Sequence, residues 1–412
     1  TGAGRYPYQS TFASGTGYAF GYSQSTIPGF YESMAGNANN KWEISDMLNI
    51  GLDWDFWNKK LYGSLDIFKE WRSNILVERS TIPNTLGVAV AKDSYGKAET
   101  KGLEVTIGHR NHVGKFNYYV EGMLTYNTNK ITEMDETEPN VEWQRKTGKR
   151  IYDYTSVAGL YESSFNGGVG GWNIYKFEQW ATDPNLIATS QQDAIDHPEK
   201  YPYNSASPKT GQQLGTAVFK DLNGDRQIDS NDMTPDTYTI IPELIPTITL
   251  GFEYKGLDAH ATLTAYLNRD VFLSPAIGWS GWGNQGTHEV VNCWGYYTDD
   301  PLDPRNINAK YPRPTYGGYN PIDSERSTGT YQNDIWIQNG NYLSLRNIEV
   351  GYSLPKQLIA KAGMTKCRFY FTGYNLFNWS GLPDGCDPEK PMGYVWWYPK
   401  THSFTFGVNI GF

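Results

Sequence analysis

The chain has 412 residues, of which 43 are glycine, 22 are proline and 15% are aromatic, while only 19% are charged. This turn-rich and ring-rich composition disfavours a charged helical bundle or a coiled coil. The formal net charge is −9, and no run of Lys or Arg exceeds two residues. The sequence therefore lacks the basic patch expected of a nucleic-acid-binding protein, and no nucleic-acid partner is expected.

No stretch of about 18 consecutive apolar residues occurs, so the sequence contains no candidate transmembrane helix. A barrel of membrane-spanning strands remains permitted. The chain begins with Thr1-Gly2 and has no initiator Met and no secretory leader. On this basis it is expected to be a mature piece or a fragment of a longer protein.

Apolar residues recur at every second position in several segments, which is the pattern of a strand with two chemically different faces. Taken in chain order, these segments are residues 48–56, 61–67, 103–107, 116–126, 248–254, 257–267 and 404–412. Short polar joints at residues 57–60, 110–114 and 254–256 connect consecutive segments, which predicts hairpins. The remaining connections are long, at about residues 131–245 and 271–341, far beyond the usual loop of about 4–6 residues.

Short turns at one end of the strands and long loops at the other are typical of an outer-membrane barrel. The predicted fold class is therefore all-β, a transmembrane antiparallel β-barrel with long extracellular loops. A soluble β-sandwich is the alternative, because its strands also alternate between a core face and a solvent face. Aromatic residues near strand ends, such as Trp54, Phe56 and Trp71, favour the barrel, whose membrane interfaces are lined by rings.

One predicted strand changes its parity. Leu343 and Leu345 lie on one face, whereas Ile348, Val350 and Tyr352 would lie on the other. A β-bulge or a change of environment is expected near Arg346 and Asn347.

The longest predicted loop contains a segment with the oxygen spacing of a calcium-binding loop, whose candidate ligands are Asp221, Asn223, Asp225, Gln227, Asp229 and Asp232. Hard divalent cations prefer such oxygen donors, with Ca²⁺ favoured over Mg²⁺. Arg226 replaces the glycine of the sharp turn, and Asp232 replaces the usual glutamate. The alternative is a metal-free turn in which Asx side chains bind their own backbone.

Five tryptophans lie in the loops, within or near glycine-rich stretches: Trp172, Trp180, Trp279, Trp282 and Trp294. Such rings could contact a sugar face or a peptide side chain, and they are the candidate substrate-binding residues. The alternative is that they pack loop against loop or form a protein interface.

Catalytic motifs are not found: the sequence has no G-x-S-x-G, H-E-x-x-H, Walker A or G-x-G-x-x-G pattern. Asp and Glu residues are numerous enough to imagine a glycosidase pair, but sequence spacing cannot place two carboxylates across one bond. The chain is therefore predicted not to be an enzyme.

Several segments together resemble the barrel of SusC-type (SusC/RagA-like) TonB-dependent outer-membrane transporters of Bacteroidetes. They are residues 42–53, the strand start 99–105, the D-x-N-G-D element at 221–229, the stretches 341–355 and 373–377, and the aromatic last strand. Because the matches follow the family order across most of the chain, residues 1–412 are interpreted as the C-terminal part of such a barrel.

The resemblance implies a full-length protein about twice this length with a barrel of about 22 strands, of which this chain supplies the C-terminal half. It also implies an N-terminal plug and a TonB-contacting segment in another part of the polypeptide. In the family, a SusD-like surface lipoprotein covers the extracellular loops, and the pair imports glycans or peptides. The expected function is TonB-dependent nutrient import across the outer membrane. The alternative is a secreted carbohydrate-active β-sandwich enzyme or binding module.

Overall fold

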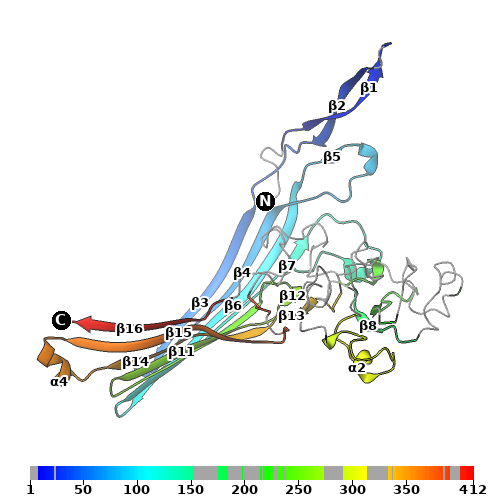
Figure 1. The fold of residues 1–412 in the computed structure, drawn as a ribbon. Helices are drawn as coiled ribbons and strands as arrows, with labels where there is room; N and C mark the ends of the chain where they lie inside the picture. The colour runs from blue at the N-terminus through cyan, green and yellow to red at the C-terminus, as the bar shows by residue number, and fades with distance from the viewer. Residues whose placement is uncertain are drawn as a thin grey trace. The chain divides into compact units, whose positions relative to one another are not determined.

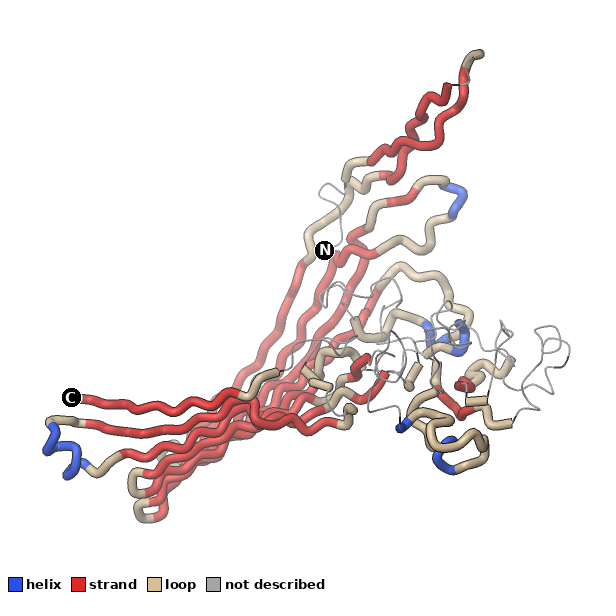
Figure 2. Tube along the Cα trace, viewed as in Figure 1, coloured by secondary structure: helices blue, strands red, loops and turns tan. Residues whose placement is uncertain are grey.

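The computed structural model describes residues 8–22, 25–151, 175–183, 197, 214–215, 217–225, 230–234, 238–272, 291–312, 333–335, 337–383, 386–389 and 400–412. Strands dominate these residues (Figure 1; Figure 2). None of the helices in this part of the chain is both long and apolar enough to span a lipid bilayer.

The main element is a nine-stranded sheet with the order β16-β15-β14-β11-β10-β7-β6-β4-β3 (Figure 1). Its strands are β3 (Ile44–Phe56), β4 (Leu61–Val77), β6 (Asp93–Val113), β7 (Phe116–Glu133), β10 (Leu244–Tyr254), β11 (Leu257–Tyr266), β14 (Tyr342–Ser353), β15 (Lys366–Ser380) and β16 (Ser403–Gly411). The pairings from β7 through β16 are antiparallel. Each predicted alternating segment coincides with one of these strands, although the segments 257–267 and 404–412 extend one residue beyond β11 and β16.

Connections of two kinds alternate along the sheet. Residues 57–60, 114–115 and 255–256 form tight turns, and a short segment with α4 (Lys356–Ile359) joins β14 to β15. The connections at the opposite strand ends are longer, most of all between β7 and β10 and between β11 and β14. We call the two sides the turn end and the loop end of the sheet.

The chain forms two compact units. The first contains residues 1–50, 67–102 and 128–151, and the second contains residues 51–66, 103–127 and 152–412. Four strands, β3, β4, β6 and β7, continue from one unit into the other.

In the second unit, the pairing register gathers the apolar side chains on one face of the sheet. Neighbouring residues form the rows Phe116-Tyr254-Leu257-Tyr352-Phe369-Val408, Tyr118-Phe252-Ala259-Val350-Phe371-Phe406 and Val120-Leu250-Ala261-Ile348-Gly373-Phe404. Many of these side chains are exposed, including Leu250, Phe371 and Phe406. Aromatic residues are concentrated in the rows nearest the turn end, as at a membrane interface.

The opposite face of the same strands is polar. Its rows include Tyr119-Gly251-His260-Glu349-Thr372-Thr405 and Glu121-Thr249-Thr262-Asn347-Tyr374-Ser403. A side chain at Gly251 would collide with the ring of Tyr119, and one at Gly407 would collide with the ring of Tyr370. These glycines let tyrosine rings lie flat across a neighbouring strand.

An exposed apolar face opposite a polar face is the arrangement of a barrel wall in lipid. In a soluble sandwich the apolar face would be covered by a second sheet. No second sheet covers these rows within the described residues, and the barrel prediction is confirmed.

The predicted irregularity near Arg346 is a β-bulge. The register of β14 shifts between Leu345 and Asn347 against both β11 and β15, so Arg346 has no partner in either ladder. The extra residue returns Leu343 and Leu345 to the apolar face, where Leu345 pairs with Leu263 and Phe377. The bulge therefore explains the parity switch without any change of environment.

The sequence pattern missed the hairpin of β1 (Thr11–Phe20) and β2 (Ser25–Ala35) in the first unit. The end of β2 also pairs in parallel with β5 (Ala89–Val90). Two further small sheets, β8 (Phe177–Trp180) with β9 (Ala217–Phe219) and β12 (Asp270–Phe272) with β13 (Ile337–Asn339), belong to the loops of the second unit. The only α-helix in the described part of these loops is α2 (Pro304–Ile307).

The two faces of β10 give a matched test of the barrel wall. We expect Leu250→Arg, on the apolar face, to destabilise the folded protein by about 2–4 kcal/mol, because the charge would lie in hydrocarbon. The neighbouring Thr249→Arg on the polar face should cost far less. Denaturant unfolding of the protein in lipid vesicles measures both changes, and equal costs would contradict the assignment of the faces.

Candidate functional site

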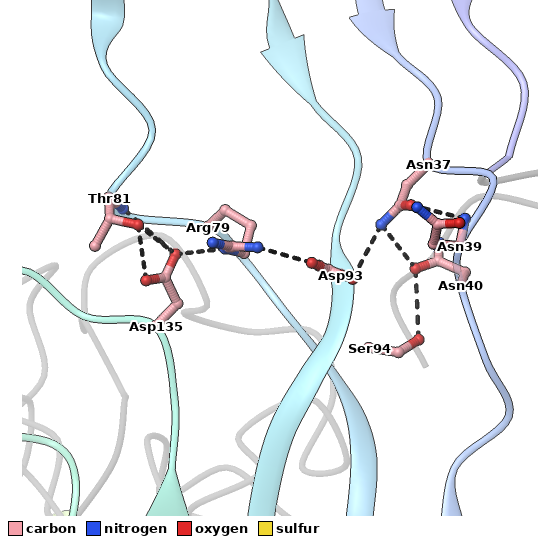
Figure 3. A network of polar contacts seen from close by, with 8 residues as sticks. All are labelled: Asn37, Asn39, Asn40, Arg79, Thr81, Asp93, Ser94 and Asp135. Carbon is pink, nitrogen blue, oxygen red and sulfur yellow. Dashed lines mark hydrogen bonds and ion pairs between the residues drawn. The ribbon is translucent and has the colours of Figure 1, made fainter.

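Within each compact unit, polar side chains form networks in the loops at the loop end or on the polar face of the sheet, and these networks are the candidate functional residues. In the first unit, Arg79 connects two of these loops (Figure 3). Its Nε donates to Asp135 Oδ2 at 2.7 Å, and its Nη1 donates to Asp93 Oδ2 at 2.8 Å. Thr81 Oγ1 donates to Asp135 Oδ1 at 2.8 Å. The β4–β5 connection is thereby fixed to the segment that follows β7.

The same network reaches the β2–β3 connection. Asn37 Nδ2 donates to Asp93 Oδ1 at 3.1 Å and to Asn40 Oδ1 at 3.2 Å (Figure 3). Ser94 Oγ accepts from the backbone N–H of Lys41 at 2.8 Å. We call the group Asn37, Asn40, Arg79, Thr81, Asp93, Ser94 and Asp135 the loop clamp, since it joins three connections that are far apart in the sequence.

Asp135 is the most enclosed carboxylate of the loop clamp, with 9% of its surface exposed. Burial alone would raise its pKa, but the hydrogen bonds from Arg79 and Thr81 outweigh that effect and hold the pKa below its usual value. The carboxylate therefore stays ionised and paired at neutral pH.

The segment after β7 is ordered by a second carboxylate. Glu136 accepts from the backbone N–H groups of Lys146 and Thr147 at 2.8 and 2.9 Å and from Thr147 Oγ1 at 2.5 Å. The backbone N–H of Ile131 also donates to the carbonyl of Lys149, and the N–H of Gly148 donates to the carbonyl of Ile131. Residues 131–149 consequently form a loop that is closed by hydrogen bonds and that contains Asp135.

In the second unit, the bulged Arg346 of β14 binds a loop residue and a tyrosine. Its Nη1 lies 2.6 Å from Glu389 Oε1, and its Nη2 donates to Tyr266 Oη at 2.7 Å. Lys400 Nζ holds the other oxygen of Glu389 at 2.7 Å. The two cations thus hold Glu389, within the β15–β16 connection, between β14 and Lys400 near the start of β16.

Arg269 supports the same corner from a buried position. Its Nε donates to the carbonyl of Ile240 at 3.0 Å and its Nη1 to that of Pro388 at 2.8 Å, while the guanidinium lies over the ring of Tyr342. Burial lowers the pKa of this arginine from its ordinary value. One side chain thus binds two connections of the second unit and the first residue of β14.

On the polar face, Arg368 contacts two carboxylates. It donates to both oxygens of Asp258, and to Glu349 Oε1 at 2.6 Å. Thr372 Oγ1 donates to the other oxygen of Glu349 at 2.8 Å. A fully paired cluster of this kind makes the inner wall hydrophilic without leaving a charge unsatisfied.

Of the five tryptophans predicted to bind substrate, two are buried in a core and three lie outside the described residues. Trp180 and Trp294 are 2% and 0% exposed, and they pack in one cluster with Phe219, Tyr311 and Ile337. Trp180 Nε1 donates to the carbonyl of Ala309 at 2.9 Å. Burial in a loop core is what the packing alternative predicts for these two residues. Contact with a ligand stays a prediction, and it would require this core to open. Trp172, Trp279 and Trp282 lie outside the described residues.

The described part of the predicted calcium loop forms a hydrogen-bonded turn. Asp221 Oδ1 accepts from the backbone N–H of Gly224 at 2.7 Å, and Asn223 Oδ1 accepts from that of Asp225 at 2.9 Å. The buried Asp232 accepts from the N–H of Leu222 at 2.8 Å. Gln227 and Asp229 lie outside the described residues.

These contacts are the Asx turns of the metal-free alternative. Among the described residues, no group of three or more His, Cys, Asp or Glu side chains is arranged to hold a metal ion. Ca²⁺ binding by residues 221–232 therefore stays a prediction, and no other part of the site depends on it.

Sequence reasoning identified only one of the arginines that organise this site, Arg346, through the parity switch. Arg79, Arg269 and Arg368 belong to no motif, and their partners are 14 to 119 residues away in the chain. Within the described residues, these networks provide paired charges in the loops and on the polar face of the sheet.

Comparison with known proteins agrees with this architecture. Residues 8–196 match the family model of the "TonB dependent receptor-like, beta-barrel". TonB-dependent receptor P3 of Formosa agariphila is 24% identical over 401 residues, covering 91% of this chain and 35% of the relative. TonB-dependent receptor SusC of Bacteroides thetaiotaomicron is 25% identical over 384 residues, covering 91% of this chain and 32% of the relative.

A solved structure shares the fold. The RagAB peptide importer in its open-open state aligns with a TM-score of 0.64 at 16% identity, over 99% of this chain and 38% of the matched chain. The chain thus spans about a third of the length of these relatives.

The loop clamp predicts an acid-sensitive loop. Because the folded-state pKa of Asp135 is lowered, its stabilising effect should be complete above the unfolded value of about 3.9 and be lost as the pH falls through the folded value. Asp135→Asn should mimic the acid state at neutral pH, with about tenfold faster hydrogen exchange in residues 131–149.

Hydrogen exchange at neutral and acidic pH, corrected for intrinsic rates, measures this effect. Glu142→Gln is the matched control, because Glu142 is an exposed acid in the same segment that pairs with Arg145 outside the clamp. Equal protection in wild type and Asp135→Asn would show that the clamp does not order the loop.

Calcium binding is tested by isothermal titration of the purified protein. A site at residues 221–232 should release heat on titration with Ca²⁺, and Asp221→Asn should weaken the affinity at least about tenfold by removing a ligand charge. Unchanged titrations in the wild type and the variant would assign the loop to the metal-free turn.

Proposed function

We propose that the chain is part of the β-barrel of a SusC-type TonB-dependent receptor, and that it forms wall and extracellular loops of an outer-membrane nutrient importer. The cargo would be an oligosaccharide or a peptide. Import would use the TonB complex for energy and a SusD-like surface lipoprotein for capture. The chain itself would perform no chemistry on the cargo.

The observation that carries this proposal is the division of the sheet into an exposed apolar face and a polar face. A wall of this kind separates hydrocarbon from an aqueous interior. The relatives are named TonB-dependent receptors, which supports TonB as the energy source. An outer-membrane location follows from the same family.

The free edges of the sheet support a larger assembly. Within the described residues, β3 pairs only with β4, and β16 pairs only with β15. An unpaired strand edge in a bilayer would leave backbone groups without hydrogen bonds, at a cost of several kcal/mol for each group. We therefore infer that further strands of the same transporter pair with β3 and β16 and close the barrel.

The loops support capture of a sizeable cargo. They enclose a buried aromatic core around Trp294 and Tyr311, and their bases are fixed by Arg79, Arg269 and Arg346. Loops whose described parts are held together in this way can present a defined surface to a lipoprotein and to its ligand. The structural neighbour is named a peptide importer, and peptide is accordingly one of the two cargo classes to test.

Fractionation of cells that produce the full transporter tests the proposal. We expect the polypeptide in the outer-membrane fraction, released only by detergent, and accompanied by a lipoprotein during purification. Deleting the gene for that lipoprotein should slow growth on the cargo while leaving the barrel in the membrane. Recovery in the soluble fraction without detergent would refute the importer.

A further inference from the structure

The turn end of the sheet has a charge opposite to that of the whole chain. We define the turn rim as residues 57–60, 110–115, 255–256 and 353–366. The rim contains no Asp or Glu, whereas the chain carries a net charge of −9. Its basic residues are Lys59, Lys60, Arg110, Lys115, Lys255, Lys356, Lys361 and Lys366.

The four segments of the turn rim are neighbours in the second unit. The backbone N–H of Arg110 donates to the carbonyl of Lys60 at 2.9 Å, which joins the first two turns. Phe116 pairs with Tyr254 at the base of the next turn. The N–H of Ser353 donates to the carbonyl of Gly256 at 2.7 Å, which joins the last two. The basic residues therefore form one continuous stripe.

The lysines of the stripe are not neutralised by the protein. All seven are exposed, and none has an ion-pair partner among the described residues. Arg110 differs, because its guanidinium lies over the ring of Tyr62 and its Nε binds the carbonyl of Lys59. By contrast, Lys69, Lys97 and Lys130 on other parts of the strands all pair with glutamates. An unpaired cationic stripe calls for an anionic partner.

The stripe adjoins the aromatic row of the apolar face. Phe116, Tyr254, Tyr352 and Phe369 belong to the row of the apolar face nearest the turns, and Lys255 Nζ lies 5.1 Å from the ring centre of Tyr254. Aromatic rings at this place mark the level of the lipid headgroups. The lysines therefore lie where the phosphates of the adjoining leaflet would be.

The α4 segment adds an apolar contact within the same stripe. Leu358 is 60% exposed between Lys356 and Lys361, whereas Ile359 is buried against the sheet. A short helix that presents a leucine between lysines suits the boundary between headgroups and acyl chains.

From this juxtaposition we propose that the turn rim is a binding surface for anionic phospholipid headgroups. The lysine ammonium groups contact lipid phosphates, and Leu358 dips into the boundary below them. Such contacts fix the height of the barrel in the membrane at its turn end. The inference rests on the proposed function, since it requires the sheet to lie in a bilayer.

The test uses the full transporter, purified in detergent and examined by native mass spectrometry with phosphatidylglycerol or phosphatidylcholine as the added lipid. The wild type should retain phosphatidylglycerol in preference to phosphatidylcholine. The combined variant Lys255→Gln, Lys356→Gln, Lys361→Gln and Lys366→Gln should retain at least about threefold less phosphatidylglycerol. The corresponding Lys→Arg variant should retain it as the wild type does.

A matched control removes four exposed lysines that lie outside the turn rim and have no ion pair: Lys41→Gln, Lys101→Gln, Lys220→Gln and Lys310→Gln. It should retain phosphatidylglycerol like the wild type. Equal loss in both variants would reduce the effect to net charge and overturn the proposal. Unchanged retention of phosphatidylglycerol in the rim variant would also overturn the proposal, and would favour an acidic protein as the partner of the stripe.

An independent readout locates Leu358. In the background Cys386→Ser, Leu358→Cys labelled with an environment-sensitive dye should shift to the blue in phosphatidylglycerol vesicles, while the exposed Leu302→Cys should not. No shift at residue 358 in a protein that is inserted in the membrane would refute the proposal. Failure to insert at all would instead refute the proposed function.

Discussion

The alternation of side chains along paired strands is the constraint on which the rest of this structure depends. In a bilayer every backbone N–H and C=O must be paired inside the protein, which only a sheet of fully paired strands or a helix achieves. Once the strands are paired, each residue is committed to one face. The rows through Leu250 and Phe252 must then be apolar, and those through Thr249 and Gly251 are free to be polar.

The same constraint explains why irregularities occur where they do. A residue inserted into a strand would turn every later side chain to the wrong face. At Arg346 the bulge prevents this by removing one residue from the ladder, so Leu345 and Ile348 share the apolar face. Because Arg346 lies outside the ladder, its side chain can bind Glu389, so the bulge also holds the β15–β16 loop.

The sequence predicted the strands in proportion to how strictly they alternate. β16 alternates without interruption and was located nearly in full, whereas β10 was located only from Ile248 onward, because Leu244 and Ile245 are adjacent apolar residues. For β6 the prediction covered only residues 103–107 of a strand that begins at Asp93, because Lys97, Glu99 and Lys101 occupy the parity that apolar residues hold further along. Lys69 of β4 and Lys130 of β7 both pair with Glu99. The charge of Glu99 is therefore neutralised by neighbouring strands, which its local sequence does not reveal.

The site was less predictable, because its contacts join distant segments through side chains that belong to no motif. Asp135 acquires its role only when Arg79 is 2.7 Å away, and nothing in either local sequence indicates the other. Trp294 is likewise an interior residue, since it packs against Trp180, Phe219 and Tyr311 from other segments of the loops. Loops long enough to capture cargo would lose much conformational entropy if each were ordered by itself. The loops share one aromatic core, and single arginines each bind more than one loop. Fewer segments must therefore be ordered independently, which lowers the entropy cost of long loops on a sheet of simple alternating strands.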